Sequence, residues 1–182
     1  MKIRILIIIL LIISFKSLGQ CPTTNIILNS QEDIDDFAIN YPGCTQILNG
    51  LSIHGNDIAN FDGLTNISTI TGDLFLDDNN ILTSLEGLIN LTTINGNLLI
   101  NGNNILDYLT GLDNLTIING NVEIISTGLT NCTGLGSLTT ITGDFKTSST
   151  HSFVGLNSLQ IIGGTLNLQS NSQLSSLNGL YV

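Results

Sequence analysis

The chain has 182 residues, enough for one domain with a buried core, and is 42% hydrophobic but only 10% charged. Its 14 acidic residues outnumber its four basic ones, so the formal net charge is −10 at pH 7. Such a surface repels phosphate backbones and anionic lipid headgroups, which argues against nucleic acid and membrane surfaces as partners.

Residues 1–19 have the pattern of a secretory signal peptide. Lys2 and Arg4 precede an unbroken apolar run over residues 5–13, and Ser17-Leu18-Gly19 supplies the small residues of a cleavage site. The apolar run is too short to span roughly 30 Å of hydrocarbon, so we expect no retained membrane span. The sequence therefore predicts a protein that is secreted or displayed at the cell surface.

Cleavage after Gly19 would make the mature chain still more acidic. Lys146 would be its only cation against 14 acids, a net charge of −13, and such acidity keeps an exported β-rich protein soluble. A second interpretation takes Leu18-Gly19-Gln20-Cys21 as a lipoprotein signal with a lipidated Cys21. Gln20 argues against lipid anchoring, because the residue before a lipidated cysteine is normally Gly, Ala or Ser.

Residues 20–48 are expected to form an N-terminal cap. Cys21 and Cys44 flank this segment, and in an exported chain they are predicted to form a disulfide. The third cysteine, Cys132, lies inside a repeat at a position otherwise held by Phe or Leu. We interpret it as a small buried hydrophobic residue.

The cap should contain a short strand and a short helix. Asn25-Ile26-Ile27-Leu28 has strand character, and Ser30 begins a Ser-Gln-Glu-Asp segment that resembles a capping box. Ile34, Phe37 and Ala38 then share one helical face, and Tyr41-Pro42-Gly43 ends the helix. A helix laid over the first coil would protect strand edges that could otherwise recruit other chains.

From about residue 49 the chain repeats one pattern every 21–24 residues: Gly-x-Leu-x-Leu, an Asn-rich turn, Gly-Leu-x-Asn-Leu and Ile-x-Gly. The clearest copy runs from Gly72 to Gly96. Self-similarity at this period predicts a solenoid, whose units bury their apolar faces only by stacking. Aligning the copies stacks like residues on like in apolar columns that should point inward, with the strands of successive coils paired in parallel.

The turn after each strand is predicted to depend on asparagine. Asn56, Asn80, Asn104 and Asn171 are aligned there, where the side chain can satisfy backbone groups of a tight bend. The fifth copy departs from the pattern, because it is short and places Thr147 in a core column. We expect the loosest coil there.

One row of side chains should point outward from the parallel strands: Ser52, Phe75, Leu99, Glu123, Lys146 and Asn167. Phe75 and Leu99 should be adjacent and exposed, flanked by Glu123. Neighbouring apolar side chains on a soluble solenoid are a plausible contact patch, and this row is the candidate binding face.

Catalytic, metal-binding and cofactor-binding residues are not predicted. His54 and His151 are far apart in sequence, no cluster has zinc-like spacing, and no Gly-rich phosphate loop follows a strand. Asp77-Asp78, near Asp57 and Asp73, could offer oxygen ligands to calcium. Ca²⁺ requires 6–8 oxygens, however, and the aligned positions of the next coil are Asn and Gly, so we favour a solvated turn.

Four Asn-x-Ser/Thr sequences occur, at Asn66, Asn90, Asn114 and Asn131. The first three share one column, so glycans there would project from adjacent coils about 5 Å apart and collide. We interpret these sequences as by-products of the repeat.

These features resemble the receptor L domain family, the leucine-rich β-helix modules of insulin- and growth-factor-type receptor ectodomains, and are most similar to its versions in exported bacterial proteins. The resemblance covers about Cys21 to Val182. It rests on the Cys21/Cys44 pair around a helix, on Asn49-Gly50-Leu51-Ser52-Ile53, and on the recurring Gly-Leu-x-Asn-Leu and Ile-x-Gly. It implies an exported, non-enzymatic, right-handed β-helix used for recognition.

The sequence thus predicts a mostly β protein: a right-handed parallel β-helix or leucine-rich solenoid of about six coils, with a short N-terminal capping helix and repeats over 49–182. The last coil is incomplete at Val182, where an end-to-end contact with a partner could form. We expect a recognition or adhesion module that binds a protein or glycan on its open sheet, without a cofactor. The alternatives are a passive spacer or fragment of a larger cell-surface protein and, with less support, a hydrolase.

Overall fold

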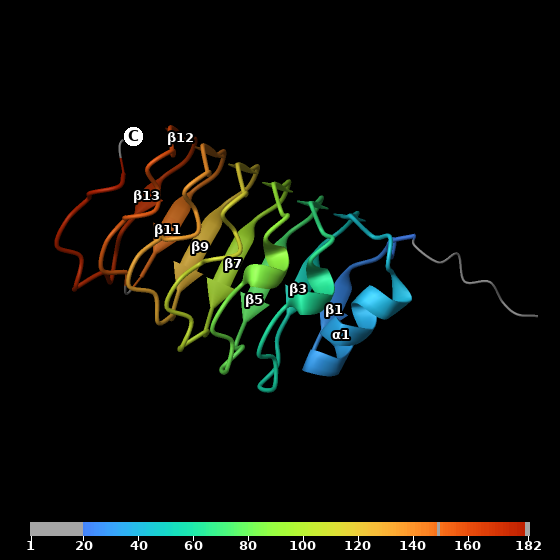
Figure 1. The fold of residues 1–182 in the computed structure, drawn as a ribbon. Coiled ribbons are helices and arrows are strands. Elements are labelled where there is room, and N and C mark those ends of the chain that lie inside the picture. The colour runs from blue at the N-terminus through green and yellow to red at the C-terminus, as the bar shows by residue number, and fades with distance from the viewer. Residues whose placement is uncertain (1–19, 149, 181–182) are drawn as a thin grey trace, which may run out of the picture.

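The computed structural model describes residues 20–148 and 150–180, and within them the chain winds into a stack of similar coils (Figure 1). The predicted signal peptide, residues 1–19, lies outside the described residues. One α-helix, two short 3₁₀ helices and two parallel sheets make up the regular structure, which confirms the predicted mostly β class. The right-handed winding and the number of coils stay predictions.

The larger sheet has seven strands in the order β1-β3-β5-β7-β9-β11-β13, each paired in parallel with the next. The first strand comes from the cap, the second follows Ile47-Leu48-Asn49-Gly50, and each later strand follows one Ile-x-Gly. The strands are β1 (Ile26–Leu28), β3 (Leu51–Ile53), β5 (Leu74–Asp77), β7 (Leu98–Asn101), β9 (Val122–Ile125), β11 (Phe145–Thr147) and β13 (Leu166–Asn167).

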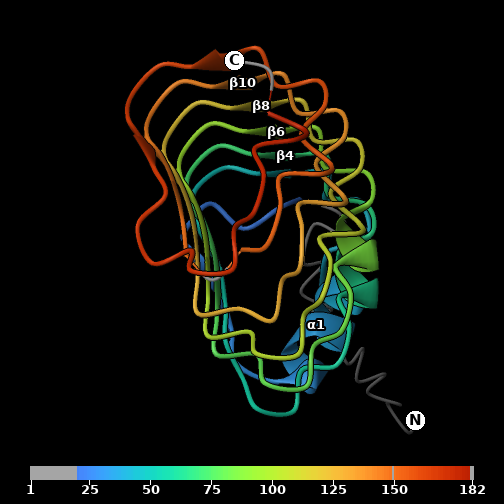
Figure 2. The ribbon, with the colours of Figure 1, turned by 90° about the vertical axis from the view of Figure 1, so that its left-hand side faces the viewer.

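The smaller sheet has six strands, also all parallel, in the order β12-β10-β8-β6-β4-β2. Seen along the stack, these strands lie above one another (Figure 2). They are β2 (Gln46–Ile47), β4 (Thr69–Ile70), β6 (Thr93–Ile94), β8 (Ile117–Ile118), β10 (Thr140–Ile141) and β12 (Ile161–Ile162). The 3₁₀ helices η1 (Asp62–Leu64) and η2 (Glu86–Leu88) form the Gly-Leu corners of two coils.

The apolar columns of the repeat form one continuous core. In β5 the side chains of Leu74 and Leu76 are fully buried, while Phe75 between them is half-buried, as the period of two requires. Burial weakens in the last described coil, where Leu166 and Leu174 are half-buried and Leu177 is 54% exposed. The difference follows because the described chain covers that coil from one side alone.

Helix α1 (Gln31–Asn40) covers the first coil, as predicted. The Ser30 hydroxyl caps it by accepting a hydrogen bond from the Asp33 backbone N–H at 3.2 Å. Ile34 and Phe37 lie on the buried face of this helix. The coil approaches so closely that a Cβ at Gly63 would overlap the Ile34 carbonyl, which explains why this corner has glycine.

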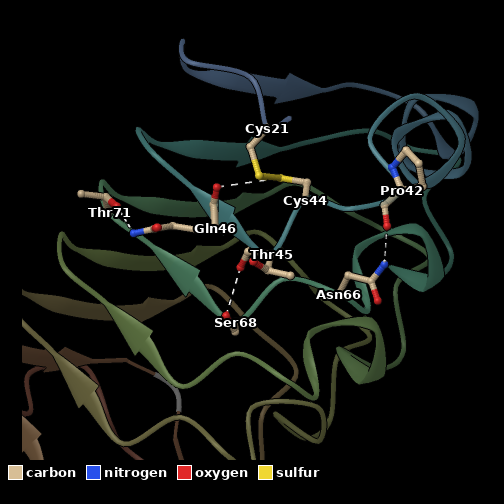
Figure 3. Close-up of a disulfide and its surroundings, with 8 residues drawn as sticks. All are labelled: Cys21, Pro42, Cys44, Thr45, Gln46, Asn66, Ser68 and Thr71. Carbon is tan, nitrogen blue, oxygen red and sulfur yellow. Dashed lines mark hydrogen bonds between the residues drawn. A yellow bond between two sulfur atoms is a disulfide. The ribbon is translucent and has the colours of Figure 1, made fainter. Parts of the chain in front are cut away.

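The predicted disulfide between Cys21 and Cys44 is present and joins the start of the cap to the segment before β2 (Figure 3). Around it, the Ser68 hydroxyl donates to the Thr45 carbonyl at 3.1 Å, which ties the cap to the next coil. The absence of lipid anchoring at Cys21 stays a prediction.

The interior also holds two residues with unusual environments. Cys132 is a buried free thiol, as expected, and burial raises its pKa to about 12. Thr147 is 1% exposed, and its hydroxyl has no hydrogen-bond partner among the described residues. An unpaired buried hydroxyl costs stability, so Thr147 weakens the core of the degenerate fifth copy.

Candidate ligand-binding face

The register of the seven-stranded sheet aligns the six residues of the predicted binding face. Each is directly paired with its neighbours, in the order Ser52, Phe75, Leu99, Glu123, Lys146, Asn167. Phe75 and Leu99 are adjacent as predicted, but both are half-buried and not fully exposed. Strands about 4.8 Å apart shield one another's side chains on both flanks, which accounts for the difference.

Sequence reasoning missed one member of this row. Ile27 in β1 pairs with Ser52 and is 58% exposed, so it extends the row beyond the repeats. The signal was present, because Ile26 and Leu28 are buried on either side of it in the predicted strand. We refer to Ile27 and the six aligned residues together as the outward row.

The outward row is hollowed in three places. The largest hollow, about 510 Å³, lies between Ile27 and Phe75. A second, of about 200 Å³, is lined by Phe75, Leu99 and Glu123, and a third, of about 250 Å³, by Glu123 and Lys146 among others. The Lys146 ammonium lies 3.4 Å from Glu123 Oε2, and since both side chains are about two-fifths exposed the pair adds little stability.

A column of Asn and Asp side chains borders the outward row, at the residue just before each strand. In four successive pairs the side-chain Oδ1 accepts a hydrogen bond from the backbone N–H of the aligned residue in the next coil: Asp73 from Asn97 (2.7 Å), Asn97 from Asn121 (2.7 Å), Asn121 from Asp144 (2.8 Å) and Asp144 from Thr165 (2.7 Å). Asn25 likewise accepts from Gly50 at 3.1 Å. We refer to these side chains, Asn25, Asp73, Asn97, Asn121 and Asp144, as the Asx ladder.

The Asx ladder was not predicted, although its sequence signal is plain. Gly72-Asp73, Gly96-Asn97, Gly120-Asn121 and Gly143-Asp144 repeat a Gly-Asx pair before four of the strands. Each Asx side chain binds the following coil.

The prediction for the asparagine turn holds for Asn80, whose amide donates to the Asp78 carbonyl at 3.3 Å, but in two coils the buried asparagine lies one residue earlier. The fully buried side chains are those of Asn79 and Asn103, which hydrogen-bond to the Ile53 carbonyl (3.1 Å) and the Leu76 carbonyl (2.8 Å). Asn80 and Asn104 are exposed and lie in a separate surface column. Asn171 belongs with the buried pair, because its amide binds the Thr147 carbonyl at 2.8 Å. The turns differ in length between coils, which shifted the alignment.

The asparagines of three Asn-x-Ser/Thr sequences have a structural function. Their Nδ2 groups donate to carbonyls of the preceding coil: Asn66 to Pro42 at 3.2 Å (Figure 3), Asn90 to Thr65 at 2.8 Å and Asn114 to Ile89 at 2.8 Å. The contacts explain why asparagine recurs in this column without any role for glycosylation.

The acidic residues considered for calcium do not gather. Asp73 precedes β5 and Asp77 ends it, so about 13 Å of strand separates them. Asp57 Oδ2 accepts the Gln31 backbone N–H at 3.3 Å, at the start of α1. Over residues 20–148 and 150–180, no group of three or more His, Cys, Asp or Glu side chains could hold a metal ion, and His54 and His151 are both exposed.

Comparison with protein families identifies this architecture. The model of the receptor L domain matches residues 43–106 and 92–178, which together span most of the chain. The chain belongs to the receptor L domain family. Receptor L domains are extracellular, non-enzymatic ligand-binding modules, and the Cys21–Cys44 disulfide and the repetitive parallel sheets of this receptor L domain fit that description.

Two further results complete the comparison for this receptor L domain. Neither the curated proteins nor the solved structures yield a significant match. Among the described residues, no helix has the length and apolar character needed to cross a bilayer.

Proposed function

We propose that this receptor L domain is an exported recognition module whose ligand docks on the outward row of the seven-stranded sheet. The observation that supports the proposal is the alignment of Ile27, Phe75 and Leu99 along one face, next to two hollows. The family consists of extracellular ligand-binding modules, which supports the interpretation of this face as a binding surface.

The composition of this face supports a contact surface over a merely solvated one. A strand residue that faces water is typically polar, and the smaller sheet follows this rule at Thr69, Thr93 and Thr140 but has the separated Ile117 and Ile161 in the same outward column. The larger sheet groups its outward apolar side chains at its N-terminal end, where Ser52 alone lies among Ile27, Phe75 and Leu99. Apolar side chains grouped beside a hollow are typical of the core of a binding surface.

The ligand class follows in part from charge. Lys146 is the only basic residue within the described chain, and its ammonium lies close to Glu123. The face therefore has no free cation for a phosphate or a carboxylate. Neutral or basic ligands fit it, either a glycan or a protein surface without a strong negative charge.

The test compares two matched pairs of substitutions in the mature chain. Phe75→Asp with Leu99→Asp places two charges on the outward row, and Thr69→Asp with Thr93→Asp places two on the smaller sheet. Both proteins should keep the parallel-sheet circular dichroism of the parent. Binding to an array of glycans and a panel of purified extracellular proteins should be lost with the first pair and kept with the second.

Retained binding in the Phe75/Leu99 variant would place the ligand elsewhere and overturn the proposal. A parent chain that binds nothing in either panel would favour a passive spacer within a larger surface protein. Hydrolysis of an arrayed glycan would instead favour an enzyme.

A further inference from the structure

The Asx ladder has one gap, and the gap is at Gly50. In the aligned column, Asn25, Asp73, Asn97, Asn121 and Asp144 each offer an oxygen to the N–H of the next coil. Gly50 has no side chain, so the next N–H in the column, that of Asp73, receives no such oxygen. This N–H has no hydrogen-bond acceptor among the described residues.

Asp73, the residue with the unpaired N–H, lines the largest hollow of the outward row. Gly50 and the small Ser52 leave space between the larger residues of the flanking strands, Ile27 and Phe75. The hollow has a volume of about 510 Å³, within the range of roughly 300–1,000 Å³ typical of small-ligand sites. Leu48, which is 45% exposed, adds a further apolar side chain to its lining.

The rest of the ladder indicates which atom completes the gap. The N–H groups of the five other residues that follow Asn25 in this column are each bound by the oxygen of a carboxamide or carboxylate at 2.7–3.1 Å. A ligand carboxylate is disfavoured at Gly50, because the acidic residue Asp73 lines the same hollow and the chain carries a net charge of −10. The carbonyl oxygen of a neutral amide remains.

The surroundings of the gap narrow the ligand further. A methyl group attached to such an amide could pack between Ile27 and Phe75, whose side chains are the apolar walls of the hollow. Asp73 Oδ1 binds Asn97 twice, through its backbone at 2.7 Å and its side chain at 2.9 Å, but Asp73 Oδ2 has no donor among the described residues. A hydroxyl group of the ligand could donate to it. An N-acetylated amino sugar has all three features: the acetamido group supplies the amide and the methyl group, and the sugar ring supplies neighbouring hydroxyls.

We propose that the hollow over Gly50 binds an N-acetylhexosamine residue of a neutral glycan. The Asp73 N–H donates to the acetamido carbonyl, the acetamido methyl packs against Ile27 and Phe75, and Asp73 Oδ2 accepts a sugar hydroxyl. The inference rests on the proposed function of the outward row. It adds to that function the ligand class and the residue, Gly50, that creates the site.

Gly50 offers a substitution that fills the site without disturbing the fold. A Cβ there would lie 3.4 Å from the Asp73 carbonyl oxygen and 3.6 Å from Asn25 Oδ1, which is ordinary van der Waals contact. Gly50→Asn should therefore fold, accept a hydrogen bond from the Asp73 N–H through its own side-chain oxygen and occupy the hollow. Gly50→Ala is the matched control, because it adds a methyl group and leaves the N–H unpaired.

The experiment uses the mature chain and two neutral probes measured by calorimetry. One probe is a short β-1,4-linked oligosaccharide of N-acetylglucosamine; the other is the corresponding oligosaccharide of glucose, which has a hydroxyl in place of the acetamido group. De-acetylated amino sugars are unsuitable, since their positive charge would attract the acidic protein regardless of the site. We expect the N-acetylated probe to bind at least about tenfold tighter than the glucose probe, and Gly50→Asn to weaken it at least about tenfold. Gly50→Ala should have a smaller effect.

Each other outcome overturns a distinct part of the inference. Equal binding of the two oligosaccharides rules out acetamido recognition. Binding that survives Gly50→Asn but not Phe75→Asp with Leu99→Asp rules out the hollow and leaves the outward row as the site. If the N-acetylated probe fails to bind and a purified protein is lost upon Gly50→Asn, the occupant is a protein amide and the glycan assignment is wrong. Binding that survives both sets of substitutions removes the proposed function as well.

Discussion

Asn103 accepts two hydrogen bonds from Asn79, one from its backbone N–H and one from its side-chain amide, each 3.1 Å long, and both residues are fully buried. This pair lies in the turn that ends two neighbouring strands, where backbone groups have no sheet partner. The amides therefore replace the sheet hydrogen bonds that the bend interrupts.

Removing this amide should destabilise the solenoid. Asn103→Ala leaves the Asn79 backbone N–H without an acceptor and the Leu76 carbonyl without the Asn103 amide, whereas the Asn79 amide keeps its bond to the Ile53 carbonyl. Each orphaned buried group costs about 1–3 kcal/mol. We expect a loss of about 2–4 kcal/mol in the free energy of unfolding, measured by urea denaturation. The adjacent and exposed Asn104→Ala is the control and should change stability by less than about 0.5 kcal/mol. Similar losses for both variants would contradict the buried role of Asn103.

A charge in the core should prevent folding, whereas the same charge one residue away should not. Leu88 is fully buried at the corner of its coil, and Leu88→Asp would bury an unpaired carboxylate with no partner. Ile89, the next residue, is 37% exposed, so Ile89→Asp should keep the fold. Circular dichroism and thermal unfolding of the two variants compare the sites directly. A folded Leu88→Asp protein with a parental melting temperature would be inconsistent with the described core.

The thiol of Cys132 should make stability depend on pH in the alkaline range. Its pKa is about 12 in the folded protein and near 9 when unfolded, because burial disfavours the thiolate. The folded state thus keeps its proton where the unfolded state loses it. The stability contribution is complete below pH 9 and declines as the pH rises from 9 towards 12.

Urea denaturation between pH 8 and pH 10.5 measures this effect. Tyrosine and lysine side chains also titrate there, so the informative quantity is the difference between the parent and Cys132→Val. The parent should lose more stability than the variant as the pH rises. A thiol-modifying reagent at pH 8 should react with Cys132 only after denaturant is added, and rapid reaction of the native protein would show that the thiol is accessible.

Reduction of the Cys21–Cys44 disulfide should loosen the N-terminal cap. The bond closes a loop with a sequence separation of 23 residues, for which chain entropy predicts a contribution of about 3 kcal/mol. Cys21→Ser with Cys44→Ser should lower the free energy of unfolding by about this amount and expose the cap to limited proteolysis. A loss confined to the cap, with the repeats still folded, would show that the coils do not depend on it.

The repeat predicted most of the fold, because aligning the copies reveals columns of buried apolar residues that no single residue would indicate. Leu74, Leu98 and Val122 were expected to stack inside, and they do. The errors concern positions where aligning the repeats does not distinguish a buried residue from an exposed one or does not apply. Asn79 and Asn80 are identical residues in a turn of variable length, so the buried one could not be distinguished from the exposed one. Ile27 precedes the repeats and therefore had no column to join.

The site was harder to predict than the fold for a related reason. A gap in a ladder is visible only when the ladder is known, and the role of Asp73 and Asn97 depends on hydrogen bonds from one coil to the next. Gly50 appeared as one more glycine in a glycine-rich chain. Its significance lies in the oxygen that it fails to provide, which composition and spacing do not report.

The hydrogen bonds of the Asx ladder all point in one direction, from the N–H of a later coil to the oxygen of the earlier one. The N–H of each coil therefore binds a side-chain oxygen of the preceding coil, and the same coil offers an equivalent side-chain oxygen to the N–H of the next one. Asp73 would meet the N–H of Asn121 as readily as that of Asn97 if one whole unit were deleted between them. Gene duplication or loss of a single unit therefore alters the length of the array while preserving its joints.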